Sequence, residues 1–151
     1  MMNKEVMFEN KGDKDRQTKA IFEFCFEMGV MFQPCERRND KYPKCDFKLL
    51  NKESGVHIGY AEVKGVKRNY DPNGNVLLAI RKLKGLQDLE LKESRKTIVI
   101  YAFEDCVKYI PIKNIKGYVK WFERTHKRPN HIFDDELVVE IKQKNLLSIK
   151  K

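Results

Sequence analysis

Three charged residues stand in apolar segments of this chain of 151 residues, at spacings that can bring them to one point. Asp46 lies in the run Cys-Asp-Phe-Lys-Leu-Leu, and Glu62 and Lys64 lie two residues apart in Tyr-Ala-Glu-Val-Lys-Gly-Val. Side chains alternate along a strand, so Glu62 and Lys64 share one face of the second segment. A hairpin of the two segments would carry Asp46 next to that face. Because unpaired buried charges are costly, packing alone does not explain this combination.

The residue types indicate phosphodiester chemistry. Two carboxylates, supplemented by the backbone carbonyl of Val63, suit Mg²⁺ or Mn²⁺. A cation held in this way polarises a phosphoryl oxygen and lowers the pKa of bound water. Lys64 can orient that water or neutralise charge that develops on phosphorus.

The charge balance favours a polyanionic partner. The chain carries 31 basic and 22 acidic side chains, a formal net charge of +9. Phosphate neutralisation releases counterions, so such an excess favours DNA, although an ordinary charged surface is the alternative. The predicted nucleic-acid-binding residues cluster after the acidic site: Lys67, Arg68, Arg81, Lys82 and Lys84. A second basic strip lies near the first predicted helix: Lys11, Lys14, Arg16 and Lys19.

Several other classes of protein are not predicted. No apolar run of about 18 residues exists, so we expect no membrane span. The first residues lack the apolar core of a signal peptide, and a cytoplasmic location is expected. Four scattered cysteines form no Cys-x-x-Cys pair and are expected to be reduced: Cys25, Cys35, Cys45 and Cys106. His126 and His131 have no cysteine at metal-ligand spacing, so a zinc site is not predicted.

Periodicity and turn residues predict the elements that position the site. The first half gives a helix over 13–28, a short strand over 30–32, strands over 45–50 and 56–66 joined by a turn at 51–55, and turn formers at 69–75. The second half gives a helix over 76–93 capped by Asn75, strands over 97–103 and 107–112, a helix over 113–125 and a strand over 137–141. In the last helix Tyr118 and Trp121 are expected to be core or interface residues.

The helix over 76–93 has a polar residue within its apolar stripe. The stripe consists of Val76, Ile80, Leu83, Gln87 and Leu91. A buried amide needs hydrogen-bond partners, so Gln87 either bonds to the sheet or turns toward a site. The sequence does not decide between these.

Pro43, Asp46 and the Glu62-Val63-Lys64 triplet resemble the motif of the PD-(D/E)xK, or restriction-endonuclease-like, nuclease superfamily. The family order of helix, hairpin, helix and strand matches residues 13–103. The resemblance implies that Asp46 and Glu62 bind the metal and that Lys64 assists the attacking water. Several subfamilies place a glutamine on the helix after the Glu-x-Lys motif, and Gln87 matches it as a further catalytic residue.

The chain departs from the family pattern in two places. The proline precedes Asp46 by three residues, where the family has the two adjacent. Many members also carry an acid on the first helix, and the candidates here are Asp15, Glu23 and Glu27. A second Glu-x-Lys sequence at Glu140 is interpreted as part of a solvated edge strand.

The combined prediction is one α/β domain over 1–151, with a central mixed sheet flanked by helices. Its restriction-endonuclease-like αβββαβ core covers about 13–103, and a C-terminal helix and strand follow over 104–151. The predicted function is a Mg²⁺- or Mn²⁺-dependent DNA nuclease, an endonuclease of the phage or resolvase-like kind. A homodimer is the candidate assembly. The alternatives are a catalytically inactive nucleic-acid-binding protein on the same fold and a protein-interaction or regulatory domain.

Overall fold

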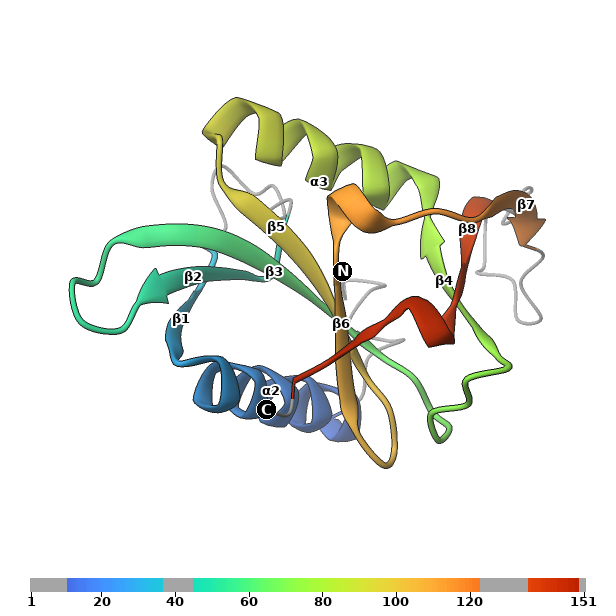
Figure 1. The fold of residues 1–151 in the computed structure, drawn as a ribbon, viewed down its shortest axis with the longest axis horizontal. Coiled ribbons are helices and arrows are strands. Elements are labelled where there is room, and N and C mark those ends of the chain that lie inside the picture. The colour runs from blue at the N-terminus through green and yellow to red at the C-terminus, as the bar shows by residue number, and fades with distance from the viewer. Residues whose placement is uncertain (1–10, 37–44, 123–135, 150–151) are drawn as a thin grey trace, which may run out of the picture.

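The structure is a computed structural model that describes residues 11–36, 45–122 and 136–149 (Figure 1). A six-stranded mixed sheet forms its centre, with the strand order β1-β2-β3-β5-β6-β9. The strands are β1 (Val30–Pro34), β2 (Phe47–Asn51), β3 (His57–Gly65), β5 (Lys96–Ala102), β6 (Val107–Pro111) and β9 (Leu147–Ser148). Only β3 and β5 pair in parallel within this sheet.

Two helices cover opposite faces of this sheet, α2 (Lys11–Met28) and α3 (Ile80–Glu93) (Figure 1). Ile21 and Phe24 of α2 pack with Ala61 and Val63 of β3, and Leu86 of α3 joins the cluster on the other face. Because β3 and β5 are covered on both faces, their residues form nearly continuous buried runs. A charged residue in the middle of β3 is therefore held in a rigid, dry environment.

A second, three-stranded sheet corrects the predicted start of the α3 helix. Its order is β4-β8-β7, with β4 at Asn75–Ala79 and β8 at Glu136–Lys142. The run from Val76 to Ala79 was predicted as helix, but it pairs with β8 and alternates in burial. A short apolar run carries no periodicity that separates helix from strand. Asn75 is accordingly not a helix cap, and its side-chain amide donates to Glu140 Oε1 at 2.8 Å.

The predicted helix over 113–125 is also wrong. A single 3₁₀ turn, η1 (Ile112–Asn114), precedes β7 (Tyr118–Phe122), which pairs with β8. A Cβ on Gly117 would come within 1.9 Å of the Glu140 carbonyl oxygen, so the chain needs glycine for this close approach. Tyr118 and Trp121 are 78% and 68% exposed, so they are not core residues, and the alternative that they belong to an interface stays a prediction. The segment after 103 thus contributes strands where a helix was expected.

The second Glu-x-Lys sequence does not lie on an edge strand. Its strand β8 has β4 on one side and β7 on the other, so the prediction of an edge position is wrong. Glu140 forms an ion pair with Lys120 and accepts the hydrogen bond from Asn75.

Among the described residues, no helix is long and apolar enough to cross a membrane. Cys25, Cys35, Cys45 and Cys106 are free thiols. Pro43, His126 and His131, which entered the sequence predictions, lie outside the described residues.

Candidate active site

The predicted hairpin forms and brings Asp46 to Glu62. Strands β2 and β3 are antiparallel with Phe47 opposite Ala61, so the residue before β2 lies beside Glu62. The connecting turn is closed by the Asn51 side chain, which accepts hydrogen bonds from the backbone N–H groups of Glu53 and Ser54 at 2.9 Å. Gly55 completes the turn at φ +72°, a conformation that favours glycine.

Asp46 is fixed at the site by contacts on two sides. Its carboxylate Oδ2 accepts a hydrogen bond from the backbone N–H of Val63 at 2.8 Å. Its own carbonyl oxygen accepts a hydrogen bond at 2.9 Å from the backbone N–H of Cys35, just after β1. The carboxylate is therefore held against the Glu-x-Lys triplet itself.

Glu62 is a buried acid in the middle of the sheet, and only 4% of it is exposed. Its Oε1 atom is buried without a hydrogen-bond partner among the described residues. Burial raises the pKa of this carboxyl from 4.5 to about 7, and the Asp46 charge adds to the increase. Lys82 and Lys64 act in the opposite direction but do not cancel the burial effect.

Two ammonium groups approach the other oxygen of Glu62. Lys64 Nζ lies 3.8 Å from Glu62 Oε2, and Lys82 Nζ lies 3.4 Å from the same atom. Lys64 comes from β3 and Lys82 comes from the first turn of α3. Lys82 was predicted as a nucleic-acid contact only. Its position could have been inferred from Leu86, which is fully buried and lies one helical turn later on the same face of α3.

The arrangement fits a small divalent cation. A buried carboxylate oxygen without a partner is costly, and a hard cation between two carboxylates would satisfy it. Asp46 and Glu62 are the residues that would hold it, with the Val63 carbonyl as the predicted third ligand. Within the described ranges, no group of three or more His, Cys, Asp or Glu side chains gathers as a metal site.

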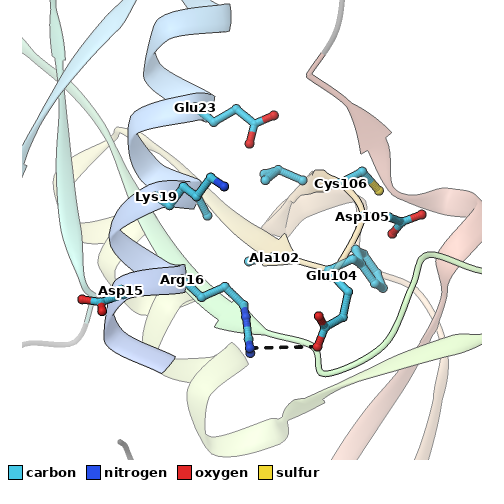
Figure 2. Close-up of a pocket in the computed structure, with 11 residues that line it drawn as sticks. Asp15, Arg16, Lys19, Glu23, Ala102, Glu104, Asp105 and Cys106 are labelled. Atoms are coloured by element: carbon cyan, nitrogen blue, oxygen red, sulfur yellow. Dashed lines mark ion pairs between the residues drawn. The ribbon is translucent and has the colours of Figure 1, made fainter. Parts of the chain in front are cut away.

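Within the described residues, none of the acids proposed for the first helix, Asp15, Glu23 and Glu27, gathers with Asp46 and Glu62 into a metal site. Asp15 and Glu23 line a separate hollow of about 370 Å³ between α2 and the turn from β5 to β6 (Figure 2). Arg16 reaches across this hollow to Glu104, with a distance of 3.9 Å between the charged groups (Figure 2). Because α2 covers the face of the sheet opposite α3, this hollow does not include the Glu62 carboxylate.

The burial predicted for Gln87 is wrong, and its catalytic role stays a prediction. Gln87 is exposed and lines a hollow with Asp88, Leu91 and Lys113 that includes none of the acidic-site residues. Leu91, which belonged to the predicted buried stripe, is 80% exposed. The predicted stripe assumed a helix that begins at Val76. The face that was predicted to be buried is therefore rotated away from the face that packs on the sheet.

The remaining predicted DNA contacts lie on the surface around the site. Lys67, Arg68, Arg81 and Lys84 are exposed. The Arg68 side chain donates to the Asn75 carbonyl oxygen, and Arg81 forms an ion pair with Glu136 at 3.6 Å. Lys67 and Arg68 directly follow β3, while Arg81 and Lys84 lie on α3. Their interaction with DNA remains a prediction.

Comparison with solved structures identifies the fold. The Holliday junction resolvase Hjc from Archaeoglobus fulgidus superposes with a TM-score of 0.57 over 89% of this chain and 95% of its own length, at 14% sequence identity. This chain has the Hjc fold. The resemblance to the restriction-endonuclease-like nucleases is thus confirmed as a likeness of fold. The strand β4 before the second helix was not predicted from the sequence.

Other comparisons add little to the Hjc likeness. A nuclease from a fusselovirus matches with a TM-score of 0.48 over 89% of this chain and 82% of its own, at 11% identity. No protein-family model and no curated protein sequence matches the chain.

Proposed function

We propose that this protein is a divalent-metal-dependent DNA nuclease that hydrolyses phosphodiester bonds. The observation that carries the proposal is the Asp46 carboxylate bonded to the Val63 amide, directly beside the buried and incompletely satisfied Glu62 carboxyl. A structural ion pair on a solvated sheet face would leave Glu62 exposed. The Hjc fold supports the same assignment, because Hjc is a Holliday junction resolvase.

Each residue of the site has a distinct role in the proposed reaction. Asp46 and Glu62, with the Val63 carbonyl, would hold Mg²⁺ or Mn²⁺. When bound there, the cation would supply a lower pKa for a water molecule and polarisation of a phosphoryl oxygen. Lys64 is 41% exposed at its side chain, so its ammonium can reach a substrate while it remains close to Glu62. There it orients the attacking water and offsets the charge that grows on the phosphate.

The substrate is proposed to be branched or duplex DNA. The net charge of +9 supports a polyanionic substrate. Lys67, Arg68, Arg81 and Lys84 are proposed to contact phosphates on either side of the cut, which positions DNA without reading its sequence. Because Hjc is a Holliday junction resolvase, a four-way junction is the first substrate to test. We expect the protein to cut within DNA strands and therefore to act as an endonuclease.

We propose that the protein acts as a homodimer, because two sites can cut both strands of one substrate within one complex. Its proposed location is the cytoplasm. Phe22 and Phe26 on α2 are 60% and 85% exposed and offer apolar surface for such pairing. Analytical ultracentrifugation tests this part: a dimer is expected, and a monomer at concentrations that support cleavage would contradict it.

The test of the proposed function is a cleavage assay over a panel of junction, flap, duplex and single-stranded DNA with Mg²⁺, Mn²⁺ or EDTA. The wild type is expected to cut at least one DNA in a metal-dependent way, and Glu62→Ala and Lys64→Ala are expected to lose activity. Lys92→Ala, an exposed position on α3, is the matched control. Full activity in both site variants would refute the assignment. Salt-sensitive binding without any product, even in Mn²⁺, would favour the inactive DNA-binding alternative.

A further inference from the structure

Lys82 is placed differently from the other basic residues of α3. Its ammonium lies closer to Glu62 Oε2 than that of Lys64, at 3.4 Å against 3.8 Å. Only 30% of its side chain is exposed, whereas Arg81 next to it is 83% exposed. The chain therefore directs Lys82 toward the sheet and away from solvent.

Helix stability does not account for this placement. Lys82 lies in the first turn of α3, where the helix dipole disfavours a positive charge. The side chain also loses hydration where it lies against the sheet, and lysine is strongly hydrated in water. A position that is unfavourable for the helix, yet directed onto the key carboxylate, is typical of a functional residue.

We propose that Lys82 is a second catalytic ammonium of this site, which contacts a non-bridging oxygen of the scissile phosphate. It acts from α3, while Lys64 acts from β3. An ammonium has three N–H donors, so one group can contact both Glu62 and a phosphate oxygen. This inference rests on the proposed nuclease function and extends it, because the sequence motif supplies only one lysine.

The contact stabilises charge and transfers no proton from Lys82. In the hydrolysis, a bond forms between a water oxygen and phosphorus, and the bond from phosphorus to a deoxyribose oxygen breaks. The water loses one proton to solvent, and the leaving oxygen gains one to become a hydroxyl group. Negative charge grows on the non-bridging oxygens in between, and a pre-positioned ammonium in a partly dry site stabilises it more than water does.

The experiment separates catalysis from binding in Lys82→Met, Lys82→Arg and the control Lys92→Met. For each variant we would measure the single-turnover cleavage rate with Mg²⁺ on the DNA that the wild type cuts best. Affinity for the same DNA would be measured with Ca²⁺, and Mn²⁺ binding without DNA by calorimetry. Melting curves would verify folding.

The proposal predicts that Lys82→Met lowers the single-turnover rate about 100-fold, the typical effect of losing one donor to a developing oxyanion. Affinities for DNA and Mn²⁺ should change little, Lys82→Arg should recover part of the rate, and Lys92→Met should match the wild type. A wild-type rate in Lys82→Met would overturn the proposal. A rate loss that is matched by weaker DNA binding would also overturn it, since Lys82 would then only anchor DNA. A rate loss that is matched by weaker Mn²⁺ binding would overturn it as well, since Lys82 would then only hold Glu62 in place. A wild type that binds no Mn²⁺ and cuts no DNA would instead refute the proposed function.

Discussion

Replacing Glu62 by glutamine should stabilise the protein at alkaline pH while it removes activity. The carboxyl pKa is raised from 4.5 to about 7 in the folded protein, mainly by burial. Each unit of pKa difference corresponds to about 1.4 kcal/mol, so the ionised Glu62 costs about 3 kcal/mol of folding free energy above pH 7. Glutamine has nearly the same shape and carries no charge. Its amide oxygen can still accept from Lys82.

The sign of the pH dependence follows from the raised pKa. The folded protein binds the Glu62 proton more tightly than the unfolded chain does, so this group favours folding most at low pH. Its contribution is lost as pH rises from about 4.5 through about 7. The stability difference between Glu62→Gln and the wild type should therefore be large at pH 8 and small at pH 5.

Urea unfolding in EDTA at pH 8 and pH 5 measures this difference. At pH 8 we expect Glu62→Gln to be more stable by about 3 kcal/mol, because the raised pKa of Glu62 already includes the opposing effect of Lys82 and Lys64. The matched control is Glu53→Gln, an exposed turn position that should stay within about 0.5 kcal/mol of the wild type at both pH values. Equal stability of Glu62→Gln and the wild type at pH 8, or the same gain at both pH values, would refute the reasoning.

Three further predictions concern metal linkage, the Asp46 contact and the packing of β3. Mn²⁺ at about 100 times its dissociation constant should stabilise the wild type by about 2.7 kcal/mol and leave the stability of Glu62→Gln unchanged. A thermal-shift assay measures this, and equal shifts in both proteins would contradict a metal site at Glu62. Asp46→Ala leaves the Val63 N–H without its acceptor, so urea unfolding should show a loss of about 1–3 kcal/mol even in EDTA, and an unchanged midpoint would count against the bond. Gly59→Ala places a Cβ 2.6 Å from the Lys96 carbonyl oxygen, so the melting temperature should fall clearly, whereas Gly85→Ala, with open space around it, should melt no lower than the wild type.

The sequence was sufficient to predict the hairpin and the grouping of its charged residues. Alternation in the Glu-x-Lys segment and the turn formers at 51–55 are local signals, and the structure forms the strands that they predict. The catalytic and metal-binding roles of Asp46, Glu62 and Lys64 remain predictions. The general fold was also predictable, because the order of a helix, a hairpin, a helix and an apolar strand restricts the topology.

Long-range pairing explains what the sequence did not reveal. The run from Val76 to Ala79 is apolar on both sides and becomes a strand only because β8 lies beside it. The helix was predicted to begin four residues too early, so the wrong face was predicted to be buried. Gln87 was therefore expected to lie inside, and the approach of Lys82 to Glu62 was missed. β7 likewise depends on the approach of Gly117 to β8, a contact that no local pattern contains.

The central claim is that Asp46 and Glu62 together hold a divalent cation. The most direct test is an anomalous difference map from crystals of the protein soaked in Mn²⁺. The account predicts a strong peak within coordination distance of both carboxylates and of the Val63 carbonyl oxygen. A fully occupied Mn²⁺ elsewhere, or no peak at this position in crystals that still cleave DNA when dissolved, would contradict it.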